Sequence, residues 1–289
     1  MRAIYLLLVF WMIPVYGEDN RAPIRFGLTA VVVTENLRFL DQWSEYLSEK
    51  MGRKVEFELR KSYQEVMDLL DAGNLDFAWI CGYPFVQTRE PETIELLSVP
   101  EYRGAPLYHS YIIVAQDSNV KNMAELEGKV FAFSDPDSNS GFLYPLALMA
   151  AQDKKPASYF RQTFFTFNHA ETVQAVSERF ADGGAVDSYI WEYLAIFKPE
   201  ITEKTRIINT SPQFGFPPIV SRLGVHPSTV QLMKTTLENM NDDAVGKSLL
   251  GQLKLDGFGH YTDALYSDIR AMANKIQRID AKFNQIPDR

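Results

Sequence analysis

The residues best suited to bind a ligand lie in one segment rich in serine and aspartate, Ser134-Asp135-Pro136-Asp137-Ser138-Asn139-Ser140-Gly141-Phe142-Leu143-Tyr144-Pro145. A strand is expected before it and a helix after it, so the segment contains a turn and a helix start. Free backbone N–H groups at a helix start, together with serine hydroxyls, can hold an anion. Ser138 or Ser140 could instead be an ordinary helix cap, as such residues commonly are. The residues alone leave both interpretations open.

Two polar side chains later in the chain lie at expected element boundaries. His169 follows Asn168 at an expected helix start, where the residues alone indicate a surface or capping histidine. Asp187 ends an expected strand, and a carboxylate repels a bound anion unless it accepts a proton from the ligand or pairs with an ammonium group on it. Asp187 would then set specificity, but it could instead cap the helix that begins near Ser188.

Cys81 is the single cysteine of the chain, so no intramolecular disulfide can form. It follows the expected strand Leu75 to Ile80, at the edge where open α/β sheets place their ligands. A buried free cysteine is usually a small apolar residue. The alternative is a thiolate ligand for a thiophilic oxyanion such as arsenite.

The sequence does not indicate an enzyme. The histidines at positions 109, 169, 226 and 260 are scattered without metal-ligand spacing, and no phosphate-binding loop or GxSxG nucleophile motif is present. We therefore expect no catalytic residues, no metal and no cofactor. The net charge of −8 also argues against a general affinity for nucleic acid or an anionic membrane.

The elements that must position these residues follow an alternating pattern. Apolar runs and helical spacing predict strands at Ile24 to Leu28, Val55 to Leu59 and Leu75 to Ile80, with helices at Leu37 to Met51 and from the capping box Ser62 to Glu65. The same order returns with strands at Lys129 to Phe133, Thr163 to Phe167 and Ala185 to Asp187, and helices from about Ser140 and Ala170. Two α/β units with largely parallel sheets are therefore expected.

Two apolar strands, Tyr108 to Ala115 and Arg206 to Asn209, are candidate crossovers between these units. A chain that leaves one lobe, builds a second and returns places its ligand in the cleft between them. The expected division is a signal peptide at 1–17, the first part of lobe 1 at 18–112, lobe 2 at 113–206, and a return to lobe 1 with C-terminal helices at 207–289.

The first residues predict secretion. Arg2 precedes an apolar run from Ile4 to Val15 and a small-residue site at Val15-Tyr16-Gly17, as in a cleavable signal peptide, and cleavage is expected after Gly17. No cysteine follows that site to carry a lipid, so we expect a soluble, monomeric protein of the periplasm rather than a lipoprotein.

A combination of motifs resembles one known family. The pattern Asp-Pro-x-Ser-x-Ser-Gly-hydrophobic-Leu-x-Pro, preceded by Asp76-Phe77-Ala78-Trp79 and Tyr108-His109-Ser110 and followed by Asn168-His169-Ala170-Glu171, resembles the periplasmic phosphate/phosphite/phosphonate-binding (PhnD-like) proteins of ABC transporters. The resemblance runs from about Ile24 to Tyr266. It implies a type II periplasmic-binding-protein fold, with two lobes of mixed, mostly parallel sheets flanked by helices and two crossover strands.

The resemblance also implies the site. Ser138, Asn139 and Ser140 would hold the oxyanion, with Tyr63, Tyr108 and a ligand-facing His169 as further contacts. Either tyrosine, taken alone, would more often be half-buried packing. Family members often have Thr in place of Asn139, which can still donate through its amide but leaves the ligand identity open.

The expected function is capture of a small phosphonate, phosphite or phosphate for an ABC permease. The alternative is a sensory receptor that presents its closed form to a histidine kinase, with arsenite bound through Cys81 as one version.

Overall fold

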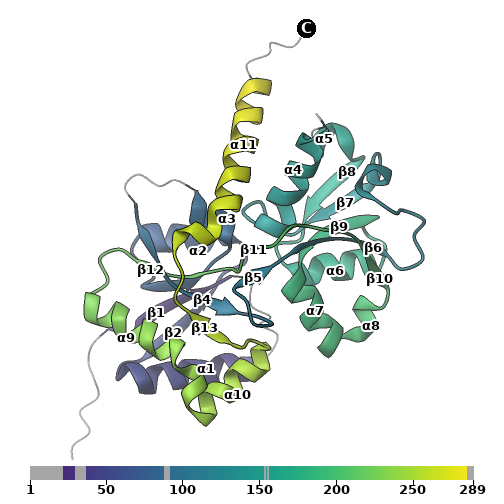
Figure 1. The fold of residues 1–289 in the computed structure, drawn as a ribbon. Helices are drawn as coiled ribbons and strands as arrows, with labels where there is room; N and C mark the ends of the chain where they lie inside the picture. Colours follow the sequence, from purple (N-terminus) through teal and green to yellow (C-terminus); the bar gives the residue numbers. More distant parts are fainter. Residues whose placement is uncertain (1–21, 30–36, 88–91, 153, 155, 285–289) are drawn as a thin grey trace, which may run out of the picture.

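The computed structural model describes residues 22–29, 37–87, 92–152, 154 and 156–284, and within them the chain forms two α/β lobes (Figure 1). The predicted signal peptide and its cleavage site lie outside the described residues. Across the described ranges, no helix is both long and apolar enough to cross a membrane.

The first lobe is built on a six-stranded sheet in the order β13-β4-β12-β3-β1-β2. Strand β1 pairs in parallel with β2 and β3, whereas β12 is antiparallel to both β3 and β4. The strands are β1 (Ile24–Leu28), β2 (Val55–Leu59), β3 (Phe77–Trp79), β4 (Ile94–Glu101), β12 (Ile219–Arg222) and β13 (Gly257–Gly259). The helices are α1 (Leu37–Met51), α2 (Tyr63–Asp71), α3 (Gly82–Val86), α9 (Pro227–Glu238), η3 (Met240–Asp242) and α10 (Ala244–Leu253).

The second lobe is built on a five-stranded sheet in the order β10-β6-β9-β7-β8. Its strands are β6 (Ser110–Ala115), β7 (Val130–Phe133), β8 (Gln162–Phe165), β9 (Gly183–Asp187) and β10 (Thr205–Thr210). Its helices are η1 (Met123–Leu126), η2 (Asn139–Leu143), α4 (Tyr144–Ala150), α5 (Pro156–Tyr159), α6 (His169–Ser177), α7 (Ser188–Phe197) and α8 (Pro199–Thr202).

Both sheets use the same arrangement around the strand that arrives from the other lobe. In the second lobe this strand is β6, which is antiparallel to β9 and β10 and lies between them. In the first lobe it is β12, which lies between β3 and β4 in the same way. This repeated insertion, with parallel pairs on one side of each arriving strand, confirms the two-lobed type II fold expected from the sequence.

A short two-stranded ribbon joins the lobes. Strands β5 (Leu107–Tyr108) and β11 (Phe214–Gly215) pair antiparallel between the two sheets (Figure 1). The run Tyr108 to Ala115 is therefore divided at His109, whose N–H donates to the Ser188 hydroxyl (N···Oγ 2.9 Å) instead of joining a ladder. After η4 (Asp263–Tyr266), helix α11 (Ser267–Asn284) packs against α3 of the first lobe and α4 of the second.

Aromatic side chains fill both cores. In the first lobe, Trp43 of α1 packs against Phe57 and Trp79, with ring centroids 5.0 and 6.0 Å away. In the second, Phe131 stacks on Phe160 at 4.6 Å. Each such buried ring stabilises the fold by about 1.5–3 kcal/mol. One apolar core cluster runs from the first lobe into the second and includes Tyr63, Cys81 and Tyr108, so these three candidate ligand contacts are fixed by packing.

Candidate oxyanion site between the lobes

The structure brings all the predicted site residues together in one buried cluster between the lobes. Each of them exposes 2 % or less of its surface. Tyr63 begins α2, Cys81 precedes α3, Tyr108 lies on β5, Ser138–Ser140 stand at the start of η2, His169 begins α6 and Asp187 precedes α7. These residues are scattered over more than 120 positions of sequence. They lie together because helix starts from both lobes converge on one place.

The serine segment forms the helix start predicted for it. The Ser138 hydroxyl accepts a hydrogen bond from the Gly141 N–H (Oγ···N 2.9 Å), so Ser138 is a helix cap. The first turn, η2, is a π-helix that continues into α4, and such widened turns recur at functional sites. A Cβ at Gly141 would lie 2.5 Å from Ser134 Cβ, so no side chain fits at this position without displacing its neighbours.

Two polar atoms of this segment are buried without a hydrogen-bond partner among the described residues. They are Asn139 Oδ1 and Ser140 Oγ. The Ser140 hydroxyl lies near that of Tyr108 but outside hydrogen-bond geometry. A buried unpaired polar group costs about 1–3 kcal/mol, so an unpaired group in a native protein calls for an explanation. The Ser138 hydroxyl has a structural role as a helix cap, whereas the Ser140 hydroxyl makes no such hydrogen bond among the described residues.

The surroundings of His169 determine which of its nitrogens carries the proton. The Asp187 N–H donates to Nδ1 (3.1 Å), and burial lowers the pKa of His169 to about 3, so the ring is neutral near pH 7. With Nδ1 acting as acceptor, the proton is assigned to Nε2. Nε2 lies 3.3 Å from the Tyr63 hydroxyl and 3.5 Å from the Ser138 hydroxyl. His169 thus presents an N–H donor to the cluster.

Asp187 caps α7 and also belongs to the cluster. Its Oδ1 accepts from the backbone N–H groups of Tyr189 (2.8 Å) and Ile190 (3.4 Å), which confirms the capping interpretation. Burial raises the pKa of Asp187 to about 7, more than the two N–H donors lower it. The carboxyl group can therefore accept or give up a proton close to neutral pH.

Direct contacts across the cluster hold the two lobes together. The Asn139 amide Nδ2 donates to the Tyr108 hydroxyl (2.9 Å), and the Asn139 backbone N–H donates to Cys81 Sγ (3.3 Å). The N–H of Tyr63 donates to Asp135 Oδ2 (3.2 Å). Burial raises the pKa of Cys81 to about 11, so its sulfur is a neutral thiol at physiological pH.

Sequence reasoning did not single out several residues that organise this interface. Asp135 and Ser134 lie within the serine-rich segment, and Ser134 Oγ contacts His169 Nδ1 at 2.8 Å. Glu192 of α7 accepts hydrogen bonds from Tyr102 of the first lobe and Tyr111 of the second, both at 2.6 Å. A strand-end Asp followed by Pro was a usable signal for Asp135. Nothing in the spacing signals Glu192, because its partner Tyr102 is 90 residues away.

Glu192 also forms an ion pair with Arg103 of the first lobe (Oε2···Nη1 2.8 Å). Together with the bond from Tyr102, this joins α7 to the turn that precedes β5. As for metals, the described residues contain no group of three or more His, Cys, Asp or Glu side chains arranged to hold an ion.

Comparison with known proteins decides the family. Residues 28–266 match the model of the family described as ABC transporter, phosphonate, periplasmic substrate-binding protein. The chain belongs to this family. It is 25 % identical over 268 residues to the phosphonates-binding periplasmic protein of Escherichia coli (strain K12), covering 90 % of this chain and 78 % of that protein.

Solved structures agree on the fold. A binding protein component of an ABC phosphonate transporter from Pseudomonas aeruginosa superposes with a TM-score of 0.83 at 22 % identity, covering 89 % of this chain and 88 % of that chain. PhnD1 from Prochlorococcus marinus (MIT 9301), solved in complex with methylphosphonate, gives 0.77 at 18 % identity, covering 88 % and 98 %.

Proposed function

We propose that this chain captures a small phosphonate- or phosphate-class oxyanion between its lobes and delivers it to the permease of an ABC transporter. Its family is one of periplasmic substrate-binding proteins, and the E. coli relative is named for binding phosphonates. The P. marinus structural relative was solved with methylphosphonate. The comparisons do not support the sensor alternative or its arsenite version.

The observation that carries the proposal is the convergence of helix starts on a cluster of neutral donors. Helices α2, α6, α7 and the continuous η2–α4 all begin at the cluster. Their N-termini bring partial positive charge, which favours an anion. The side-chain donors are the hydroxyls of Tyr63, Tyr108, Ser138 and Ser140, the His169 Nε2–H and the Asn139 amide.

These donors suit a ligand that is bound by both lobes. In the proposed sequence, the oxyanion binds first to the Ser138 to Ser140 helix start on the second lobe. Tyr63 and Tyr108, with the backbone near Cys81, then close over it from the first lobe. Because the closed form offers the ligand more hydrogen bonds than the open form, binding shifts the population towards closure.

Asp187 gives this proposal a specificity rule. A buried carboxylate beside an anion is favourable only if one proton is shared between them or if the ligand brings an ammonium group. Asp187 would therefore select oxyanions that are protonated near neutral pH, or aminoalkylphosphonates. Sulfate, which carries no proton at neutral pH, should be rejected.

Cys81 takes a secondary part in the proposed site. Its neutral thiol accepts the Asn139 N–H and thereby orients the helix start that holds the oxyanion. The raised pKa disfavours the thiolate that thiophilic ligation requires.

Further parts of the proposal follow from the class of protein. We propose that the chain has no catalytic activity, that its leader is removed after Gly17 without lipid attachment, and that it works as a monomer. Mass spectrometry of the exported protein and its mass in solution by light scattering test the last two points.

A ligand screen tests the function directly. Thermal shift would be measured with phosphate, phosphite, methylphosphonate, an aminoalkylphosphonate, arsenite and sulfate. A true ligand at 100 times its dissociation constant adds about 2.7 kcal/mol to the free energy of unfolding, a clear rise in melting temperature. The proposal predicts such a rise for at least one phosphorus oxyanion and none for sulfate. No response to any phosphorus oxyanion would refute it.

A further inference from the structure

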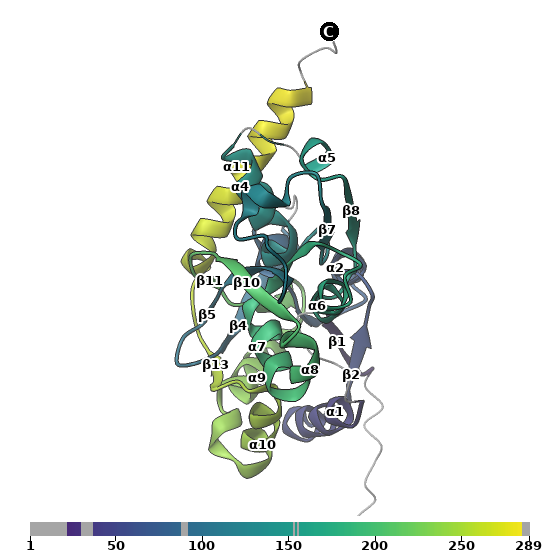
Figure 2. The same ribbon diagram turned by 90° about the vertical axis from the view of Figure 1, so that its right-hand side faces the viewer.

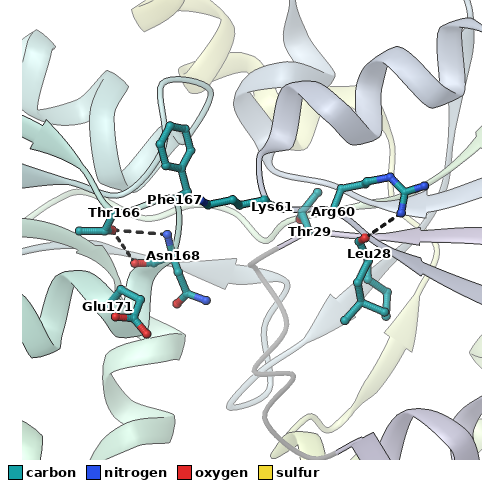
Figure 3. Close-up of a pocket in the computed structure, with 9 residues that line it drawn as sticks. Leu28, Thr29, Arg60, Lys61, Thr166, Phe167, Asn168 and Glu171 are labelled. Atoms are coloured by element: carbon teal, nitrogen blue, oxygen red, sulfur yellow. Dashed lines mark hydrogen bonds between the residues drawn. The ribbon is translucent and has the colours of Figure 1, made fainter.

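A cavity of about 240 Å³ lies between the lobes, outside the buried cluster. Its first-lobe wall includes Thr29, Arg60 and Lys61, and its second-lobe wall includes Phe167 and Glu171 (Figure 3). Lys61 lies two residues before Tyr63, and Phe167 lies two residues before His169. The Tyr63 hydroxyl and His169 Nε2 are 3.3 Å apart. This outer cavity therefore adjoins the Tyr63–His169 contact that forms one wall of the buried cluster.

The outer cavity lies on the side of the molecule away from the connecting ribbon. Figure 2 shows β1, β2, β8 and α6 on one side, with β5 and β11 on the other. Lobes joined by that ribbon separate most on the opposite side. A ligand that reaches the buried cluster in the open protein therefore passes the walls of the outer cavity.

Charge distinguishes the outer cavity from the buried cluster. The buried cluster contains neutral donors and Asp187, and in the described part of the chain no Lys or Arg forms a hydrogen bond or ion pair with its residues. The whole protein carries a net charge of −8. An approaching anion is therefore repelled on average, and the cluster itself provides no full positive charge to offset this.

Lys61 provides such a charge at the mouth. Arg60 is paired with Glu58 (Nη2···Oε2 3.0 Å), but the Lys61 ammonium has no hydrogen-bond or ion-pair partner within the described ranges. Its side chain extends from the first lobe towards Phe167 of the second (Figure 3). Phe167 has a backbone φ of 58°, which is rare for a bulky residue and is tolerated where the surroundings enforce it.

We propose that the outer cavity is an anion subsite in which Lys61 captures the ligand before the lobes close. The inference rests on the proposed function, because it assumes an anionic ligand in the buried cluster. Glu171, on the opposite wall, opposes capture and confines the anion to the Lys61 side. The subsite acts on the rate of association and not on the rate of dissociation.

The test compares association and dissociation rates by stopped-flow fluorescence with methylphosphonate, or with inorganic phosphate if methylphosphonate does not bind. Lys61→Gln should lower the association rate constant about threefold to tenfold and flatten its dependence on salt, with the dissociation rate unchanged. Glu171→Gln should raise the association rate constant. Lys54→Gln is the matched control, because Lys54 is an exposed first-lobe lysine outside the cavity and its loss changes the net charge equally.

Each outcome decides between the two proposals. Equal association rates for Lys61→Gln and Lys54→Gln would overturn the outer subsite while leaving the proposed function intact. A faster dissociation for Lys61→Gln with unchanged association would also overturn it, since Lys61 would then belong to the closed complex. If calorimetry detects neither ligand nor any other phosphorus oxyanion, the proposed function fails and the subsite fails with it.

Discussion

Replacing Ser140 with alanine tests whether this serine serves ligand binding or the stability of the fold. The Ser140 hydroxyl is fully buried and makes no hydrogen bond among the described residues. Its removal therefore loses no internal bond and relieves an unpaired polar group. If water reaches the hydroxyl when the ligand-free lobes open, that relief shrinks towards zero. The free energy of unfolding without ligand should stay equal or rise by up to about 1 kcal/mol.

Ligand binding should change in the opposite direction. A hydrogen bond to a charged oxyanion contributes about 1.5–3 kcal/mol, so Ser140→Ala should weaken binding about tenfold to 150-fold. Urea unfolding of the ligand-free protein gives the first quantity, and calorimetry with the best phosphorus oxyanion gives the second. Such a gain in stability with a loss of binding is the signature of a functional site.

Ser98 supplies the matched control. It is equally buried, but its hydroxyl donates to the Gly259 carbonyl (3.1 Å) within the first-lobe sheet, and it is not one of the cluster residues. Ser98→Ala should therefore lower the free energy of unfolding by about 1 kcal/mol and leave affinity unchanged. The reasoning would be refuted if Ser140→Ala destabilised the protein as much as Ser98→Ala and left affinity intact.

Three further predictions concern the groups around the cluster. Burial raises the pKa of Asp187 to about 7 from about 4 in the unfolded chain, so its contribution to stability is present below pH 4 and lost as pH rises through 7. Asp187→Asn should therefore gain stability relative to the parent between pH 4.5 and 7.5 in urea unfolding, and a difference independent of pH would contradict this. Glu192→Gln should lower the free energy of unfolding by about 1–3 kcal/mol and weaken ligand binding, because it removes an ion pair and strong acceptors that join the lobes. The same change at the exposed Glu200 should affect neither quantity. Equal effects of the two variants would refute the role of Glu192 in joining the lobes. Cys81 should react slowly with a thiol reagent at pH 8, because burial raises the pKa of its thiol to about 11. The reaction should be slower still with ligand bound. Rapid labelling of the liganded protein would show that the thiol is not enclosed.

Much of the fold could be predicted because local patterns were strong. The helical spacing from Leu37 to Met51 and the capping box at Ser62 correspond directly to α1 and α2. Strand β4 has no such signal, because Pro100 lacks the N–H that a central strand normally uses. Strand β13 has two glycines in three residues, which carry little strand preference. β13 pairs with β4 because the chain returns to the first lobe, and local sequence patterns do not predict such a long-range contact.

The candidate site was predictable as a set of residues but not as a geometry. Motif resemblance pointed to Ser138 and His169, the end of an expected strand pointed to Asp187, and all three lie in the cluster. The protonation of His169 depends on the Asp187 N–H and on burial, which no spacing rule provides. The unpaired state of the Ser140 hydroxyl depends in the same way on which side chains the fold places around it.

Calorimetry of the parent protein beside the double variant Ser138→Ala/Ser140→Ala tests the central claim most directly. Two charge-assisted hydrogen bonds together contribute about 3–6 kcal/mol, so a phosphorus oxyanion should bind the parent at one site and the folded variant at least about 100-fold more weakly. Circular dichroism confirms that the variant keeps its fold, since Ser138 also caps the helix. Equal affinity in a folded double variant would contradict the assignment of the oxyanion to this helix start.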